Sequence, residues 1–341
     1  MPNFEIIEID NPKWQSIVRS SYVYDFHHTA FYHGIDNDHR SVLLVATEDS
    51  DFLALPLVIR PIEGTDWYDV TSVYGYGGAI ANKSFEVVTS SLVEYFKVAV
   101  KDFFLNNNIV SVFSRLHPLI NSRQVFDGMG EVVNLNRTVA IDLTLPVEIQ
   151  RRQYRKSNKS EINQLRRKGL IVEEATTRHE VERFIEIYYE TMDRVDAIPY
   201  YYFSREYFHS FMENSSFDSR LLVAKDNGDI VAGAIFTITQ KIMEYHLAGT
   251  VGEYIQMTPM KLIIDEARLL GSSLSLEYLH LGGGVGGSDD DSLFRFKSGF
   301  SDYYCQFAVW KYVVDENQYN QLVDSKSGID KSSNFFPLYR A

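Results

Sequence analysis

LHLGGGVGGSDDDSLFRFKSGF, residues 279–300, decides how the second half of the chain folds. Its apolar start ends a strand that we expect over residues 274–281, and the glycine run 282–287 lets two backbones approach closely. Asp291 suits the N-cap of a short helix that ends at Gly299. The stretch therefore predicts a strand that runs through a glycine loop into a short helix.

The segments before and after this stretch predict a mixed sheet with helices. Apolar spacing and turn residues predict strands at 170–175, 219–225, 230–239, 242–249 and 303–314. The same patterns predict helices at 177–196, 204–212 (with Ser204 as N-cap), 259–270 (ended by Gly271) and 316–323. A helix should also start near Pro146, run through the basic stretch 151–168 and end at Gly169.

The first half repeats part of this order. A hairpin is expected from strands 41–48 and 52–59, followed by a strand at 70–76 and a helix at 84–104 that the asparagines 106–108 end. Buried strands are expected at 109–116 and 137–143. We predict an α/β (α+β) fold of two tandem modules, residues 1–145 and 146–341, each a mixed, mostly antiparallel sheet flanked by helices.

Composition places the chain among ordinary globular proteins. It has 341 residues, of which 45% are hydrophobic and 23% are charged. The single cysteine, Cys305, excludes a disulfide framework and a Cys-based metal cage. No apolar run is long enough to span a membrane, and the N-terminus lacks a secretory signal pattern. We therefore expect a cytoplasmic protein without a transmembrane segment.

Charge is concentrated in one short stretch. The net charge is −13, yet residues 151–168 hold eight Lys and Arg and one Glu. This balance disfavours DNA as a partner. The basic stretch could contact an anionic substrate or a tRNA backbone, form a solvated helix face, or touch an anionic membrane surface.

Several segments resemble the FemABX-type tandem GNAT acyltransferases, also described as FemAB-like or acetyltransferase-6 proteins. The likeness is carried by RRKGLIVEEA, YYETMDRVDAIPYYYFSREYF, MEYHLAGT and the opening stretch, with VYDFHHTAFYH and YGYGGA in the first half. The resemblance implies transfer of an amino acid from aminoacyl-tRNA to an amine of a peptidoglycan precursor. It implies no metal and no tightly bound cofactor.

The same resemblance suggests site residues in the second half. Lys297 matches a lysine that is important for transfer, and its ammonium could stabilise an oxyanion. The alternative is a solvated helix lysine. Arg194 would lie near the acceptor, unless it only pairs with Asp193 or Asp196. Gly283 and Gly284 would border the site.

Two departures bear on the donor. Arg295 stands where many acetyl-CoA GNATs have a tyrosine that acts as general acid. Residues 249–259, GTVGEYIQMTP, lack the basic residue and the glycine spacing with which GNATs hold a pyrophosphate. These departures favour aminoacyl-tRNA over acyl-CoA as the donor.

Other candidates rest on residue type. His246 could act as a general base beside Tyr245, although only one of the two can point to a given face of a strand. In the first half, Asp25 and Tyr32 could bind the acceptor, as could Tyr74 and Tyr76. His27, His28 and His33 near Asp25 fit no standard closed metal site, and a magnesium role for Asp289, Asp290 and Asp291 is weakly supported.

The sequence thus predicts an enzyme that transfers an acyl or aminoacyl group to an amine of a cell-wall precursor or envelope saccharide. One alternative is an acetyl-CoA-dependent N-acetyltransferase. The other is a non-catalytic module that binds an envelope precursor.

Overall fold

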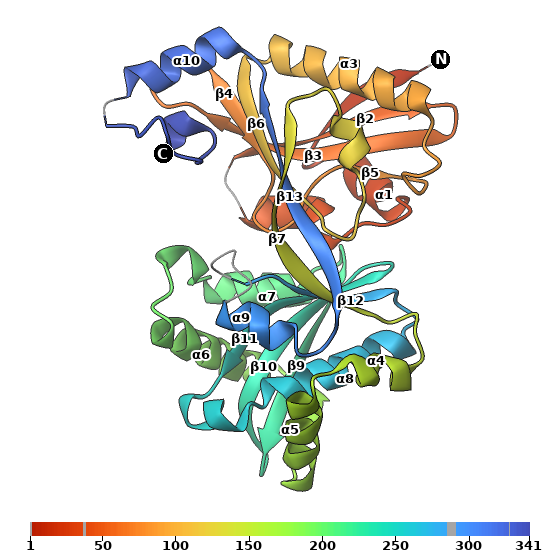
Figure 1. Ribbon diagram of the computed structural model, residues 1–341, viewed down its shortest axis with the longest axis vertical. Helices are drawn as coiled ribbons and strands as arrows, with labels where there is room; N and C mark the ends of the chain where they lie inside the picture. Colours follow the sequence, from red (N-terminus) through yellow and green to blue (C-terminus); the bar gives the residue numbers. More distant parts are fainter. Residues whose placement is uncertain (1, 37–38, 285–290, 327) are drawn as a thin grey trace. The chain divides into compact units, whose positions relative to one another are not determined.

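The computed structural model describes residues 2–36, 39–284, 291–326 and 328–341, and it divides into two compact units. Unit 1 comprises Met1–Asn136 and Gln306–Ala341, and unit 2 comprises Arg137–Cys305. The chain passes between the units inside two strands, β7 (Glu131–Asp142) and β13 (Tyr303–Val313) (Figure 1). The expected domains 1–145 and 146–341 placed residues 306–341 in the second half, whereas these residues pack in unit 1.

Unit 1 is built on a mixed sheet. Its strands lie in the order β1-β2-β3-β4-β6-β13, with β5 paired to β3. The strands other than β13 are β1 (Asn3–Glu8), β2 (Arg40–Glu48), β3 (Asp51–Pro61), β4 (Tyr68–Thr71), β5 (Ile80–Ala81) and β6 (Ile109–Leu116). The predicted hairpin is confirmed as the antiparallel pair β2–β3, and β4 runs parallel to β6.

Helix α3 (Ser90–Asn106) packs on this sheet. It begins six residues later than expected, because the Thr89 hydroxyl caps it by accepting a hydrogen bond from the N–H of Leu92. Its buried side chains join one apolar core with Trp14. The pattern did not predict β1, nor the remaining short helices: α1 (Lys13–Arg19), η1 (Phe26–His28), α2 (Ala30–Asp36) and η2 (Arg123–Phe126).

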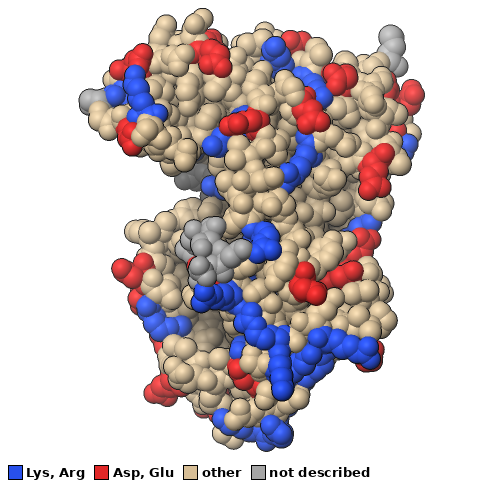
Figure 2. Space-filling view, in the orientation of Figure 1, with Lys and Arg blue, Asp and Glu red and all other residues tan. Residues whose placement is uncertain are grey.

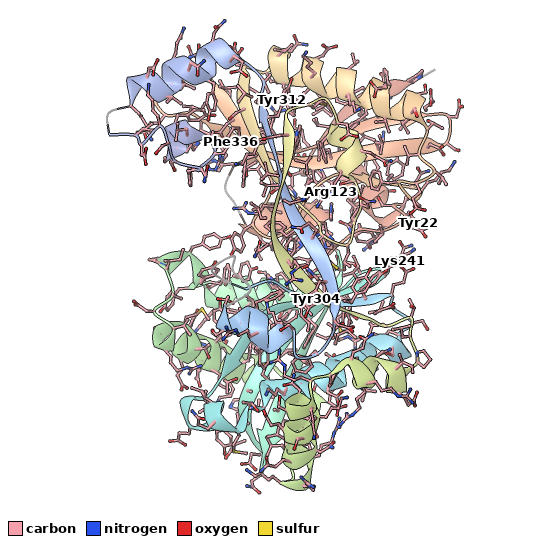
Figure 3. All side chains as sticks on the ribbon, viewed as in Figure 1. Tyr22, Arg123, Lys241, Tyr304, Tyr312 and Phe336 are labelled. Carbon is pink, nitrogen blue, oxygen red and sulfur yellow. The ribbon has the colours of Figure 1, made fainter. Side chains whose placement is uncertain are left out.

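Side-chain contacts explain why the C-terminal segment belongs to unit 1. Residues 308–313 of β13 pair with 111–116 of β6. After α10 (Glu316–Ser325) and η5 (Leu338–Arg340), the hydroxyl of Tyr339 lies 2.7 Å from Ser111 Oγ, and Arg340 Nε donates to Asp69 over 2.6 Å. Phe336, labelled with Tyr312 in Figure 3, lies against Phe113.

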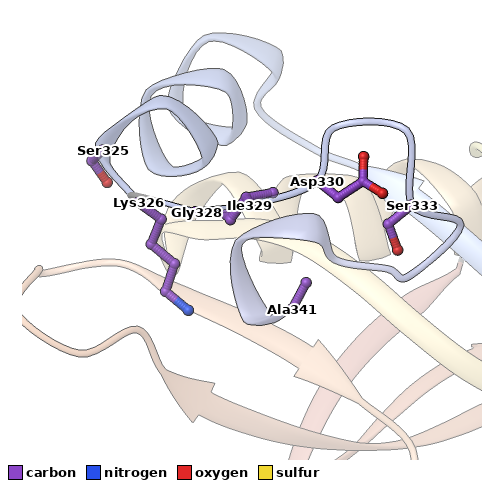
Figure 4. Close-up of a pocket in the computed structure, with 7 residues that line it drawn as sticks. All are labelled: Ser325, Lys326, Gly328, Ile329, Asp330, Ser333 and Ala341. Carbon is purple, nitrogen blue, oxygen red and sulfur yellow. The ribbon is translucent and has the colours of Figure 1, made fainter.

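A surface pocket of about 540 Å³ lies between the end of α10 and the C-terminal turn (Figure 4). It is lined by Ser325, Lys326, Gly328, Ile329, Asp330, Ser333 and Ala341. None of the site residues expected from the sequence lines it.

The strands of unit 2 continue the sheet in the order β7-β12-β11-β10-β9-β8. Its further strands are β8 (Ile171–Glu174), β9 (Asp218–Asp226), β10 (Asp229–Ile238), β11 (Ile242–Thr250) and β12 (Tyr278–Gly282). Only β11 and β12 are parallel among these pairs. The predicted hairpin around Asn227 is confirmed as β9–β10.

Helices cover both faces of the sheet in unit 2 (Figure 1). On β10, a side chain at Gly233 would collide with Phe184 of α6, while Ala232 and Ala234 pack in the core that contains α8. The elements concerned are α6 (Arg178–Arg194), η3 (Pro199–Tyr201), α7 (Arg205–Glu213), η4 (Gly252–Met257) and α8 (Met260–Ser273).

Two helix predictions in unit 2 were wrong. The helix expected from Pro146 to Gly169 is two helices, α4 (Val147–Gln153) and α5 (Lys156–Arg167), because Tyr154 turns into the core and packs 5.1 Å from the ring of Phe300. Gly271 does not end α8, which continues to Ser273. A Cβ at Gly271 would lie 2.7 Å from Leu143, so the glycine provides room for close packing instead.

Among the residues that the structure describes, no helix combines the length and apolar character needed to cross a membrane.

Candidate functional site

The two parallel strands of unit 2 part after a short stretch of pairing. β11 and β12 pair at three registers, the last of which is Glu244 with His280. β12 ends two residues later at Gly282, while β11 continues to Thr250 and bulges at His246 against β10. The sheet therefore opens beyond Glu244, next to the residues that the sequence singled out.

Lys297 is the last residue of helix α9 (Ser292–Lys297), which Asp291 caps by accepting a hydrogen bond from the N–H of Phe294 over 2.8 Å. The lysine is buried rather than solvated. Its Nζ donates to the carbonyl oxygen of Gly283 over 2.7 Å and lies 5.7 Å from the ring centre of Tyr245. Burial lowers the pKa of Lys297 to about 8, and the negative charges of Glu244 and Asp291 oppose that shift.

The glycines next to β12 are required by these contacts. Gly283 supplies the carbonyl that holds Lys297. A Cβ at Gly284 would lie 2.2 Å from Asp291 Oδ1, so a side chain there would displace the cap of α9. Residues 285–290 lie outside the described residues, and with them Asp289 and Asp290 of the magnesium role weighed above.

Tyr245 and His246 lie on opposite faces of β11, as strand alternation predicts. Tyr245 faces Lys297, and burial raises the pKa of its hydroxyl. His246 stacks on Phe211 of α7, with ring centres 4.8 Å apart, and its Nε2 lies 3.4 Å from the hydroxyl of Tyr207. The structure thus brings Tyr245, and not His246, into contact with Lys297.

Sequence reasoning missed two buried polar residues at the last paired register of β11 and β12. Glu244 Oε2 lies 2.5 Å from Nδ1 of His280, whose Nε2 lies 2.9 Å from Thr138 Oγ1 on β7. All three side chains are buried. The signal available in the sequence was a glutamate and a histidine inside two apolar strands, where an ionisable side chain needs a partner.

The remaining candidates of unit 2 lie apart from Lys297 or are chemically inert. Arg295 is exposed on α9. Arg194, at the end of α6, lies 3.8 Å from Glu190, rather than in the alternative pairs with Asp193 or Asp196. Burial raises the pKa of the Cys305 thiol to about 12, so this cysteine is a poor nucleophile.

Acidic side chains from other elements accept hydrogen bonds from the stretch between β11 and α8. Glu190 Oε1 accepts a hydrogen bond from the N–H of Gly252 over 2.6 Å. Beside it, Tyr254 donates to Asp226 over 3.0 Å, and Thr258 donates to Glu161 over 3.0 Å. At the position where GNATs hold a donor pyrophosphate, carboxylates therefore accept hydrogen bonds from groups that could otherwise bind phosphate.

In unit 1, Asp25 is buried completely and cannot touch a ligand directly as expected. Its Oδ2 lies 2.9 Å from Nδ1 of His27 and 3.1 Å from Nε2 of His117. Burial alone would raise the pKa of Asp25, but these hydrogen bonds hold it well below its usual value. His117 is a further residue that sequence spacing missed.

The unit 1 tyrosines surround this pair. Tyr32 is buried and donates to the carbonyl oxygen of Tyr74, which is itself exposed. The ring of Tyr76 lies 5.6 Å from both His27 and His117. Gly75 has a φ of +102°, and a Cβ there would lie 2.1 Å from Nε2 of His27. Asp25 and Tyr32 therefore support the segment that carries Tyr74 and Tyr76.

The basic stretch divides into inward and outward cations. Arg151 and Arg166 each donate to the buried carboxylate of Asp265 over 2.8 Å, and Arg268 donates to it as well. Lys and Arg side chains gather over α4 and α5 (Figure 2). The exposed ones that do not contact Asp265 are Arg152, Arg155, Lys156, Arg167 and Lys168.

Comparison with known proteins supports the sequence resemblance. Residues 152–297 match the family model of the acetyltransferase (GNAT) domain. No curated protein sequence matches the chain.

Solved structures share the fold over most of the chain. The structure of FemX has a TM-score of 0.71 at 11% identity, over 93% of this chain and 99% of that one. L-PGS from Bacillus licheniformis has a TM-score of 0.57 at 13% identity, over 91% and 94%. The C-terminal domain of a candidate lysylphosphatidylglycerol synthetase from Agrobacterium fabrum has 0.55 at 12%, over 88% and 90%.

At these identities the likeness is one of fold, and it confirms the predicted α/β class with two GNAT-like modules. Residues 152–297 therefore match the acetyltransferase (GNAT) domain family, and the chain as a whole shares the fold of FemX, as expected for a FemABX-like tandem GNAT protein.

Proposed function

We propose that the protein transfers an aminoacyl group from a charged tRNA to an amine of a cell-wall precursor or envelope saccharide. One observation carries this proposal: a buried lysine, Lys297, is fixed beside the opening between β11 and β12, within a domain that matches an acyltransferase family. The names of the fold neighbours are consistent with it, since one refers to a lipid that carries a lysyl group.

The local geometry suits stabilisation of a developing negative charge. When an amine attacks an ester carbonyl, the carbonyl oxygen gains charge in the transition state. An ammonium whose position is set by Gly283 and by the Tyr245 ring needs no reorganisation to stabilise that oxygen. Direct attack needs no covalent enzyme intermediate, which agrees with the high pKa of the Cys305 thiol.

The choice of donor rests on the stretch between β11 and α8. A helix N-terminus can bind phosphate through its free N–H groups. Here Glu190 already accepts a hydrogen bond from the N–H of Gly252, and Glu161 accepts one from the hydroxyl of Thr258. Two carboxylates next to a pyrophosphate would repel it. An acyl-CoA donor is therefore the less favoured alternative, while the exposed cations of α4 and α5 offer contacts to a tRNA backbone.

Donor binding to the purified protein tests the proposal. Calorimetric titration with acetyl-CoA, and then with a small set of charged tRNAs at two salt concentrations, should give salt-sensitive tRNA binding only. Acetyl-CoA binding at micromolar concentrations would overturn the choice of donor. Binding of an envelope precursor without turnover of any charged tRNA would favour the non-catalytic alternative.

A further inference from the structure

A second pocket lies in unit 2, between helix α5 and the turn that joins η4 to α8. Its volume is about 130 Å³, which corresponds to roughly four water molecules at about 30 Å³ each. On the α5 side it is lined by Glu161, Gln164, Leu165 and Lys168. The space suits one flat ring system rather than an extended ligand.

Thr258 gives the turn on the other side of the pocket an uncommon backbone. Its φ of +54° and ψ of +47° lie in the left-handed region, which a β-branched residue rarely adopts. The hydroxyl of Thr258 donates to Oε2 of Glu161 over 3.0 Å, and Lys261 donates to the same oxygen. Helix α5 therefore holds the strained turn in place. Strain that is kept in this way is concentrated at functional sites, and here it borders the pocket.

The polar side chains that line the pocket have unused hydrogen-bonding capacity. Among the residues that the structure describes, none bonds to Oε1 of Glu161 or to the side-chain amides of Gln164 and Gln256. The hydrogen bond from Lys261 lowers the pKa of Glu161, so its carboxylate is ionised at neutral pH. An ionised carboxylate only accepts hydrogen bonds, whereas each amide both donates and accepts. One acceptor and two amides are therefore available to the polar edge of a ligand.

Each wall of the pocket also contributes an apolar side chain. Leu165 comes from α5 and Met257 from the end of η4. The thioether of a methionine makes favourable contacts with aromatic rings. Lys168, which is exposed next to the end of α5, adds a cation to the lining. A flat ring with a polar edge, linked to a phosphate, is the chemistry of a nucleotide.

The available groups favour the bases that carry an amino group. Adenine and cytosine each present an exocyclic amine beside a ring nitrogen that accepts hydrogen bonds. A glutamine can pair with both groups of adenine, and a glutamate can accept from the amine of cytosine. Uracil has no amine to donate to Glu161. Proteins read RNA bases in this way chiefly in single-stranded loops and ends.

We propose that the pocket between α5 and Thr258 binds one adenine or cytosine from a single-stranded segment of RNA. This inference rests on the proposed function for the choice of RNA as the source of the base, because the exposed cations of α4 and α5 are assigned there to a tRNA backbone. Acetyl-CoA also contains an adenine, so the experiment must separate the two sources.

Fluorescence anisotropy with two short single-stranded RNAs of equal length tests the proposal at one salt concentration. One RNA is built of adenine and cytosine, and the other of uracil. Their phosphates are equal in number, so backbone contacts contribute alike to both. The RNA with the amino-bearing bases should bind about tenfold more tightly, since one well-placed pair of hydrogen bonds to a base discriminates by that much.

A double variant, Gln164→Ala with Gln256→Ala, removes both amides without changing the charge. It should lose the preference for adenine and cytosine and keep its affinity for the uracil RNA. Gln240→Ala is the matched control, because this exposed glutamine lies in the connection between β10 and β11, and it should retain the preference. The proposal is wrong if neither RNA binds, if the wild type shows no preference, or if the control loses the preference as well.

Competition with acetyl-CoA identifies the source of the base. If acetyl-CoA displaces the RNA from the wild type and not from the double variant, the pocket holds the adenine of a coenzyme and the assignment to RNA is overturned. A preference for amino-bearing bases without transfer from any charged tRNA would support the pocket and refute the proposed reaction. Transfer from a charged tRNA without that preference would support the reaction and refute the pocket.

Discussion

Nζ of Lys297 donates to the carbonyl oxygen of Gly283 over 2.7 Å, so one cation is fixed at the end of β12. If this cation stabilises the oxyanion, Lys297→Ala should lower kcat by about 10²–10³-fold with a smaller change in KM. Lys297→Arg keeps the charge but not the position and should recover only part of the rate. Steady-state kinetics measure this effect.

The control for that experiment is Lys241→Ala. Lys241 pairs with Glu277 at 2.9 Å, before the start of β11 (Figure 3). Its removal should leave kcat within about twofold, since this partly buried ion pair lies before the paired end of β11, away from the opening. Equal losses in the two variants would show that Lys297 has no special role.

The burial that suits Lys297 to catalysis should also reduce stability. Its folded pKa of about 8 lies below its unfolded value, so the unfolded state binds more protons between pH 8 and 10.5 and stability should rise with pH there. Lys297→Met should raise the free energy of unfolding of unit 2 at pH 7 by about 2 kcal/mol. Thermal melting of the variant beside the wild type measures this gain, and a lower melting temperature would contradict it.

Unit 1 should lose stability in mild acid. Burial lowers the pKa of His28 and of His33 to about 3. Between pH 6.5 and 3 the unfolded state therefore takes up protons that the folded state excludes, and stability falls with pH. Each of the two histidines should cost about 2 kcal/mol between pH 7 and 5. Hydrogen exchange of unit 1 peptides measures it, and His33→Asn should make the dependence shallower.

Much of this fold could be predicted from local patterns. Ser204 and Asp291 cap their helices as expected, by accepting hydrogen bonds from Tyr207 and Phe294. Caps and hairpins depend on residues a few positions apart, which a single sequence displays. The same holds for the opposite faces of Tyr245 and His246.

The rest depends on contacts between distant segments. The pairing of β13 with β6 joins residues about 200 positions apart and places the C-terminal segment in unit 1. Glu244 and His280 are 36 residues apart and meet only through the parallel pairing of their strands. The break at Tyr154 has no proline or glycine signal, since it follows from the packing of one ring on Phe300.

The contact between Glu190 and Gly252 predicts how the donor preference could be changed. Glu190→Ala removes the charge and frees the N–H of Gly252. Acetyl-CoA affinity should then increase about tenfold, as one charge-assisted acceptor site becomes available to a phosphate. Calorimetry measures it, with Glu186→Ala as the control on the same helix. No gain in affinity would mean that Glu190 does not exclude the pyrophosphate.

The exposed cations of α4 and α5 predict a salt-dependent contact with a polyanion. If Arg167 and Lys168 each neutralise one phosphate of a tRNA, their joint replacement by alanine should reduce the slope of log K against log salt by about two. Arg178 and Arg183 on α6 form the matched control pair. Arg151 and Arg166 are unsuitable, because both are bound to Asp265 and their loss would destabilise unit 2. Filter binding of charged tRNA across a salt series measures the slope, and equal slopes in the two double variants would place the tRNA elsewhere.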